Sequence, residues 1–263
     1  MSSDPGGIAD LIWQHWRSGT LIRKTGFSNL PTSRTDAYAA QARLEEKSSE
    51  PRAGWKIAAT SAAGQAHIGV DGPLAGRVLA ETLHDDGATV SVATNQMRVA
   101  EPEFAFRFGQ HVPSRPEPYT GDDVMALVLD LHLTIELPDS RLHDFANAGG
   151  PCLIADNACA RDLIVGPVVT ADWRSIDLSA HPVHCDVAGR YTRDGIGSNV
   201  LGDPRAALTW CVNEVSALGI DIQEGELITT GTAAVPLEIE PGDRVIMDFG
   251  VLGSVSLMIA DEV

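Results

Sequence analysis

The feature that most constrains the fold is a long succession of short β-like runs that begins at Gly54. Each run is apolar or alternating and is broken by Gly, Pro or Asp-Gly. The clearest are GWKIAAT, GATVSVA, EFAFRF, LHLTIEL, LIVGPVV, VHCDVAG, GELITTG, DRVIMDFG and GSVSLMIA. Because few helical patterns separate these runs, we expect a β-rich α+β fold, a mixed β-roll or sandwich, rather than a regular alternation of strands and helices.

Helical patterns dominate the N-terminal end. IADLIWQHWRSG spaces its apolar residues at helical intervals and ends in glycine, and RTDAYAAQARLEEK is rich in residues that favour helices. The segment SSEPRAG then breaks the pattern. We therefore predict a small helical N-terminal part over residues 1–53 and a β-rich catalytic body over residues 54–263.

Two helices are expected inside the body, each with its own start signal. In TGDDVMALVLD, Thr120 and Asp123 resemble a capping box. In DPRAALTWCVNEVSALG, Asp203 is the expected N-cap and Gly219 follows the last turn.

The net charge limits the classes of partner that this protein is expected to bind. The 263 residues carry 19 Lys and Arg against 36 Asp and Glu, a formal net charge of -17. A surface this acidic argues against a nucleic-acid or anionic-membrane partner, since both carry negative charge. An anionic small molecule stays open, because a local pocket can have the opposite sign.

The four cysteines, Cys152, Cys159, Cys185 and Cys211, form no CxxC pair and no disulfide-rich pattern, which favours buried free thiols in a reducing compartment. The N-terminal residues lack a basic stretch followed by an apolar one, so no signal peptide is expected. No run approaches the roughly 18 apolar residues of a membrane span. We expect a cytoplasmic protein.

The run RVAEPEFAFRFG carries different chemistry on its two faces. Read with period 2, its three phenylalanines point one way and Glu101 and Glu103 the other. The two carboxylates would lie about 7 Å apart and would repel one another without a positive group between them. A solvated strand face is the simplest interpretation. Pro102, which has no N–H, suggests instead an edge or a bulge where a site opens.

A third carboxylate, Glu136, ends the apolar run LDLHLTIEL. Together with Glu101 and Glu103 it would form an all-oxygen set contributed by two strand ends. Such a set suits Mg²⁺ or Mn²⁺ better than zinc.

Lys56 stands inside the apolar run GWKIAATS, in a chain whose only other lysines are Lys24 and Lys47. One interpretation is a lysine at a sheet edge whose amine reaches solvent. The other is a partly desolvated amine with a lowered pKa, suited to proton transfer.

Weaker candidates lie in two loops. Cys159, in DNACA, is either a structural thiol or a reactive one, although no base is identified for it. The loop TTGTAAVP, which holds Thr230 and Gly231, is either a plain turn or a loop that faces substrate. With Arg141, these three residues are our candidate substrate contacts.

Taken together, these segments resemble the fumarylacetoacetate hydrolase superfamily, and within it the 2-keto-4-pentenoate hydratase and 4-oxalocrotonate decarboxylase branch. DAYAAQ resembles the N-terminal helix motif, GWKIAATS the segment with the catalytic lysine, and GVDGP the loop that follows it. EPE resembles the paired metal-binding glutamates and ELPDSR the segment with the third. ADNA resembles a loop of that branch and PGDRVIMDFGVLGSVSL the closing hairpin. The match keeps the family's order over nearly the whole chain.

The resemblance implies a β-rich body fused to a small helical domain, assembled as a homo-oligomer. It implies Mg²⁺ or Mn²⁺ held by Glu101, Glu103 and Glu136, chelated by the carboxylate and 2-oxo oxygens of a 2-oxo acid or dienoate. Lys56 would move a proton on the carbon skeleton or activate the water that adds at C4. The implied function is a metal-dependent lyase, a hydratase in aromatic catabolism.

Two departures from the branch stand out. Its usual PDFG reads PLAG here, so Leu74 replaces an aspartate that works with the lysine, and Cys159 replaces a serine. Three alternatives to the hydratase follow. A 4-oxalocrotonate-type decarboxylase would need a cation for a second carboxylate, such as Arg141 or Arg161. An acylpyruvate C–C hydrolase would need a base such as His67 or His84. A non-catalytic binding homologue is the interpretation that Leu74 favours.

Overall fold

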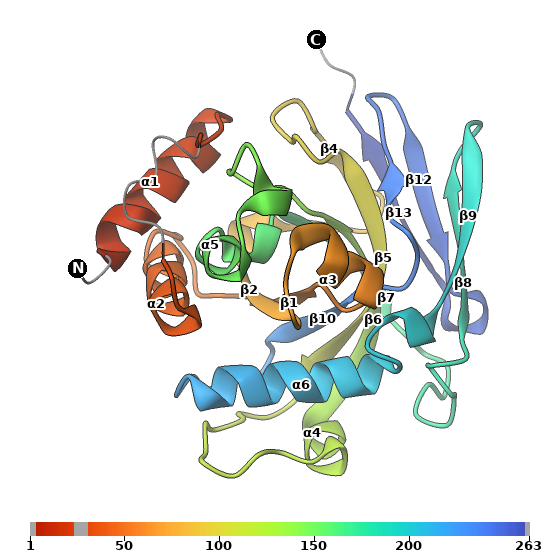
Figure 1. The fold of residues 1–263 in the computed structure, drawn as a ribbon. Helices are drawn as coiled ribbons and strands as arrows, with labels where there is room; N and C mark the ends of the chain where they lie inside the picture. The colour runs from red at the N-terminus through yellow and green to blue at the C-terminus, as the bar shows by residue number, and fades with distance from the viewer. Residues whose placement is uncertain (1–3, 24–30, 261–263) are drawn as a thin grey trace.

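The computed structural model describes residues 4–23 and 31–260 (Figure 1). Over these residues the helices are α1 (Pro5–Ser18), α2 (Arg34–Glu45), α3 (Ala62–Ile68), α4 (Gly121–Leu127), α5 (Gly150–Ala155) and α6 (Pro204–Ala217). The strands are β1 (Gly54–Ala58), β2 (Leu74–Val78), β3 (Leu83–Asp85), β4 (Thr89–Val90), β5 (Val99–Phe108), β6 (Val128–Leu137), β7 (Asp162–Val168), β8 (Pro182–Val187), β9 (Tyr191–Ile196), β10 (Leu227–Thr232), β11 (Leu237–Glu238), β12 (Arg244–Asp248) and β13 (Ser254–Ile259).

In this part of the chain the strands form two sheets. The eight-stranded sheet runs in the order β2-β1-β10-β5-β6-β7-β3, with β11 added to β5, and the five-stranded sheet in the order β4-β13-β12-β8-β9. The pairs β1/β10, β3/β7 and β4/β13 are parallel and the others antiparallel. The predicted β-rich α+β class, with a mixed sheet and a helical N-terminal part, is confirmed.

One face of the eight-stranded sheet forms the main core. Phe104, Phe106 and Phe108 alternate along β5 onto this face and are buried, as the period-2 pattern predicts. The rings of Phe104 and Phe249 meet with centroids 5.1 Å apart, close to where the five-stranded sheet packs against the larger one. The opposite face is therefore free to carry polar side chains.

The helical N-terminal part packs directly against the body (Figure 1). Ile12 of α1 and Leu44 of α2 belong to the same hydrophobic core as the strands. The buried Gln41 side chain donates to the carbonyls of Ala75 and Ile154, both at 2.9 Å, and so ties α2 to β2 and α5. The predicted domain boundary lies between α2 and β1 and stays a prediction.

The expected helix signals act as predicted in α4 and α6, whereas the short body helices α3 and α5 were not predicted. Thr120 and Asp123 form a complete capping box at the start of α4. The Asp203 side chain accepts from the backbone N–H of Arg205 at 2.7 Å, and Gly219 follows α6 with a left-handed φ of 73°.

The sequence did not reveal four strands, β2, β3, β9 and β11. β3 and β11 have three and two residues, too few to show an alternating pattern. All five residues of β2 are buried, because the strand lies between β1 and the helices α2 and α5. β9 is a polar edge strand of the five-stranded sheet. Each helix in the described ranges is too short or too polar to cross a membrane.

Candidate metal centre and active site

Three carboxylates converge on the polar face of the eight-stranded sheet. Glu101 and Glu103 alternate along β5, and Glu136 lies directly opposite Glu101 on β6. One oxygen from each lies within 4.8 Å of the others. Glu103 and Glu136 are buried, whereas Glu101 is partly exposed. Strand register thus brings together the three residues that the sequence singled out.

The pairing of β5 is irregular beside this cluster. Its register with β10 shifts between Thr229 and Thr232, and the carbonyl of Pro102 accepts the N–H of Ala233 at 2.8 Å. β5 lies inside the sheet, so an edge position for Pro102 is wrong. The bulge that the proline also suggested is present, on the neighbouring strand.

Lys56 reaches the cluster from β1 and is 3% exposed. Its Nζ lies 2.9 Å from Glu136 Oε1 and donates to the carbonyl of Ala158 at 3.1 Å. Burial opposes the charge on the amine, but the three carboxylates, Glu136 foremost, outweigh it and raise the pKa of Lys56. Both interpretations of Lys56 from the sequence are therefore wrong: its amine does not reach solvent, and the surrounding side chains raise its pKa rather than lower it. Lys56 is an ammonium paired with the Glu136 carboxylate.

Burial also raises the pKa of two carboxyl groups in the cluster. It raises the pKa of Glu101 to about 7, with the charge of Glu136 acting in the same direction and that of Lys56 opposing it. Burial first, then Glu136 and Glu101, raise the pKa of Glu103 well above its usual value. Crowded, buried carboxylates are costly to ionise without a nearby cation beyond the single lysine.

Two oxygens of the cluster lack partners. Glu103 Oε1 and Glu136 Oε2 are buried and have no hydrogen-bond partner within the described residues. A buried carboxylate oxygen is costly to leave unpaired, and an all-carboxylate set is the kind that hard divalent cations prefer. The residues present therefore fit a divalent metal ion such as Mg²⁺.

A left-handed turn orients the carbonyl that holds the lysine. All three residues of the turn Asn157–Cys159 have positive φ, between 51° and 61°. The Asn157 side chain bonds both the N–H and the C=O of Arg77 on β2, at 2.7 and 2.8 Å. Gly76 makes room, since a Cβ there would lie 2.3 Å from the Asn157 carbonyl oxygen. Such locally strained backbone is typical of functional sites.

The two arginines considered for a second substrate carboxylate are both engaged. Arg141 is buried, and its Nε and Nη2 donate to Asp156 Oδ1 and to the Asp156 carbonyl, both at 2.6 Å. Arg161 pairs with Asp139 at 3.0 Å. The structure thus places Arg141 in a buried ion pair, and a role in substrate binding would require that pair to open.

The other candidate substrate contacts have different surroundings. The Thr230 hydroxyl donates to the Phe104 carbonyl at 2.9 Å, within the sheet. The N–H of Gly231 donates to Glu103 Oε2 at 2.8 Å. Cys159 is buried in the left-handed turn, and burial is the main cause that raises its pKa to about 12, which disfavours the reactive thiolate. Substrate binding by these residues stays a prediction.

Thr229 falls both in the β-like run GELITTG and at the start of TTGTAAVP, which was interpreted as a loop, but residues Thr229 to Thr232 belong to β10. Thr229 was not among the predicted site residues, although it shares the polar face with Lys56 because the two are register partners on β1 and β10. Its hydroxyl donates to Glu103 Oε2. The alternation of GELITTG could have placed Thr229 and Leu227 on one face, but no sequence signal connects that face to Glu103.

Two further positions bear on the alternatives. Leu74 is buried on β2 opposite Ala58, so it shares the sheet face of Lys56 and supplies no acid there. His84 bonds Asp162 at 2.8 Å, and His67 packs its ring 6.1 Å from that of Phe145.

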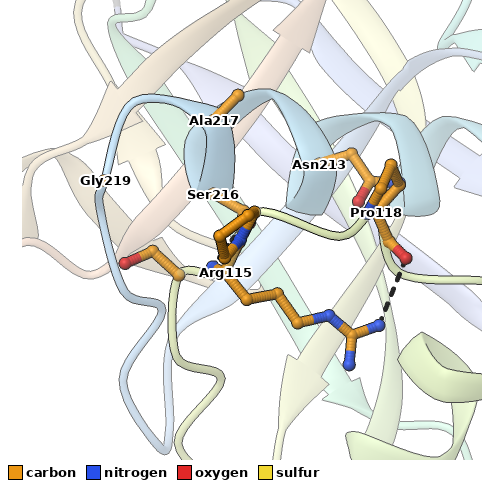
Figure 2. Close-up of a pocket in the computed structure, with 8 residues that line it drawn as sticks. Arg115, Pro118, Asn213, Ser216, Ala217 and Gly219 are labelled. Atoms are coloured by element: carbon orange, nitrogen blue, oxygen red, sulfur yellow. Dashed lines mark hydrogen bonds between the residues drawn. The ribbon is translucent and has the colours of Figure 1, made fainter.

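A separate surface hollow lies elsewhere on the molecule (Figure 2). It has a volume of about 510 Å³ and lies between the loop at Arg115 and the end of α6. The Arg115 guanidinium bonds the Pro118 carbonyl at 3.2 Å and Asp123 at 3.0 Å. None of the predicted site residues is among the described residues that line it.

Comparison with known proteins finds relatives along most of the chain, although no protein-family model matches it. A 2-hydroxyhexa-2,4-dienoate hydratase from Comamonas testosteroni is 32% identical over 83% of this chain and 82% of its own. A 2-keto-4-pentenoate hydratase from Paraburkholderia xenovorans is 28% identical over 94% and 91%. The structure of a 4-oxalocrotonate decarboxylase from Pseudomonas putida G7, complexed with magnesium and adipate, covers 97% of both chains with a TM-score of 0.87 at 25% identity.

Proposed function

This chain belongs to the 2-keto-4-pentenoate hydratase and 4-oxalocrotonate decarboxylase branch of the fumarylacetoacetate hydrolase superfamily, and on that premise we propose that it hydrates a 2-hydroxy-2,4-dienoate in aromatic catabolism. One observation carries the proposal. Two buried carboxylate oxygens, on Glu103 and Glu136, have no partner within the described residues and lie in one cluster with the ammonium of Lys56. A divalent cation would satisfy both oxygens, and Mg²⁺ is the first choice because the decarboxylase relative was solved with it.

In the proposed mechanism Glu101, Glu103 and Glu136 would hold the ion, which would supply Lewis acidity to the carboxylate and 2-oxygen of the substrate. Lys56, held by Glu136 and the Ala158 carbonyl, gives a proton to the carbon skeleton. That proton goes to C5 while the 2-hydroxyl gives its own proton to the amine, so the lysine ends as it began and a 2-oxo-3-enoate results. Water then adds its oxygen at C4 and its proton at C3. Lys56 is 3% exposed, which limits the access of other water to the proton that it transfers.

The charge pattern favours a substrate with a single carboxylate. A decarboxylase of this kind acts on a diacid, whose second carboxylate needs a cation. Arg141 and Arg161, the arginines considered for that purpose, are paired with Asp156 and Asp139. This supports the hydratase over the decarboxylase.

The decarboxylase is the second candidate, because the similarity to the 4-oxalocrotonate decarboxylase extends over 97% of both chains. The acylpyruvate hydrolase has less support, since His84 is in register with Ile164 of β7, and through it with Ile135 of β6, and so lies on the other face of the sheet from Glu136. Leu74 keeps the non-catalytic binding homologue as a testable outcome.

A substrate panel tests the proposal. The purified chain with Mg²⁺ or Mn²⁺ is mixed separately with 2-hydroxypenta-2,4-dienoate, a 4-oxalocrotonate and an acylpyruvate. Loss of the dienoate's ultraviolet absorbance supports the hydratase. Release of carbon dioxide from the oxalocrotonate alone identifies the decarboxylase, and cleavage of the acylpyruvate alone identifies the hydrolase. Metal binding without turnover of any substrate would overturn a catalytic function.

The remaining parts of the proposal concern the setting of the enzyme. We propose a small-molecule 2-oxo acid or dienoate as the partner, with no nucleic acid or membrane. A homo-oligomer and a cytoplasmic location, both expected from the sequence, belong to the same proposal. Sedimentation of the purified chain would test the assembly.

A further inference from the structure

The two oxygens of the Glu103 carboxylate have different surroundings. Oε2 accepts two hydrogen bonds, from the hydroxyl of Thr229 and from the backbone N–H of Gly231 at 2.8 Å. Oε1 is buried and has no partner in the described part of the chain. One oxygen is thus committed to the protein and the other is left for a ligand.

The hydroxyl protons around Glu103 can be assigned. As a metal ligand the Glu103 carboxylate would be ionised and could only accept, so Thr229 donates to Oε2. The Thr134 hydroxyl lies 3.1 Å from Thr229 Oγ1 and 3.4 Å from the backbone carbonyl oxygen of Glu103. Because the Thr229 proton is already used, Thr134 is the donor in its contact with Thr229, and its one proton is shared with the longer contact to the Glu103 carbonyl oxygen. The two hydrogen bonds therefore run in one direction, from Thr134 on β6 to Thr229 on β10 and from Thr229 to the Glu103 carboxylate.

The backbone of β10 supplies the second bond by breaking the strand register. The bulge between Thr229 and Thr232 frees the Gly231 N–H from the ladder, so that it can point at Glu103. Gly231 has a φ of 96°, and a Cβ there would lie 2.3 Å from Thr60 Oγ1. A glycine is therefore required at the position that makes this bond.

We propose that Thr229 is a positioning residue of the metal centre, whose hydroxyl, together with the Gly231 N–H, holds the Glu103 carboxylate so that Oε1 alone faces the cation. This inference rests on the proposed function, because it takes Glu103 as a metal ligand. Groups that orient a ligand in this way typically contribute about 10- to 100-fold to metal affinity. Thr229 acts through Glu103, so its effect should appear in metal binding itself.

Calorimetric titration with Mg²⁺ tests the inference without any substrate. Thr229→Val keeps the shape of the side chain and removes the hydroxyl, and we expect it to weaken Mg²⁺ binding about 10- to 100-fold. Thr229→Ser keeps the hydroxyl and should bind Mg²⁺ nearly as the unmodified chain does. Thr230→Val is the matched control, because Thr230 is the equally buried neighbour whose hydroxyl bonds the Phe104 carbonyl instead.

The outcomes separate the two proposals. If the unmodified chain binds Mg²⁺ and Thr229→Val binds it equally well, the role of Thr229 is rejected while the metal centre stands. Equal weakening in Thr230→Val would also reject it, since the effect would then be general damage to β10. If the unmodified chain binds no Mg²⁺, the metal centre and the role of Thr229 both fail. Should Thr229→Val not fold, as judged by circular dichroism, Thr229→Ala is compared in the same way.

Discussion

Lys56 and Glu136 form a buried ion pair, with Nζ 2.9 Å from Oε1, while the other oxygen of the same carboxylate has no partner within the described residues. One side chain thus contacts the candidate proton carrier and also offers an oxygen to a cation. This arrangement links the two parts of the proposed chemistry, proton transfer by Lys56 and cation binding by Glu136.

Replacing Lys56 by methionine separates proton transfer from metal binding. The variant Lys56→Met removes the ammonium and keeps most of the side-chain volume, so we expect loss of dienoate turnover. Mg²⁺ binding should be retained or tightened, because a positive charge beside the cation site is removed. Turnover by absorbance and binding by calorimetry give the two readouts. Lys47→Met, on the surface beside Asp10, is the control that should change neither. Turnover retained in Lys56→Met would reject its catalytic role.

Mg²⁺ should stabilise the folded chain. A ligand at 100 times its Kd contributes about 2.7 kcal/mol, which corresponds to a rise of several degrees in Tm for a domain of this size. Glu136→Gln should abolish this rise, because it removes the charge and the unpaired oxygen. Glu117→Gln, at an exposed position, should keep it. The measurement is thermal unfolding with Mg²⁺ and with a chelator. A Mg²⁺-dependent rise that survives in Glu136→Gln would place the ion elsewhere.

The left-handed turn should be sensitive to a single methyl group at Gly76. In Gly76→Ala the new Cβ would lie 2.3 Å from the Asn157 carbonyl oxygen, so the turn that aims the Ala158 carbonyl at Lys56 must shift. We expect a loss of about 1–3 kcal/mol in the free energy of unfolding, together with slower turnover. Gly72→Ala is the control, since a Cβ there meets nothing within 4 Å. Urea unfolding and the dienoate assay give the comparison, and equal behaviour of the two variants would count against the turn.

Arg141 should matter for stability more than for substrate choice. Arg141→Met leaves Asp156 buried without its partner, and breaking such a pair costs about 3–5 kcal/mol. We expect a large fall in the urea midpoint. Arg161→Met, in a partly exposed pair, should cost much less. If Arg141→Met were instead as stable as the unmodified chain and raised KM for a diacid, the substrate role predicted from the sequence would be supported.

The sequence was sufficient for features that depend on local patterns. Alternation along β5 predicted which face Glu103 and Phe104 occupy, and the capping box at Thr120 predicted where α4 begins. The three glutamates could be grouped because each lies in an apolar run, and the apolar composition of these runs predicts that they are buried. These features need only the period of a strand and the chemistry of a carboxylate.

The remaining features depend on contacts between distant segments. Asp156, at the end of α5 and 15 residues from Arg141, forms an ion pair with it. No pattern in either segment predicts this ion pair. Thr229 reaches Glu103 only because two strands are neighbours and one of them has a bulge. The pKa of Lys56 is raised, whereas burial alone would lower it. The burial of Lys56 could be predicted from the sequence, but the combined charge of the three carboxylates around it could not.

The absorbance of 2-hydroxypenta-2,4-dienoate tests the central claim most directly. It should be followed with the unmodified chain and with Glu103→Gln, each in Mg²⁺ and in a chelator. We predict loss of absorbance only for the unmodified chain with Mg²⁺, because only that sample has the cation held by all three carboxylates. Equal loss in Glu103→Gln or in the chelator, or no loss when the unmodified chain has bound Mg²⁺, would contradict metal-dependent hydration at this site.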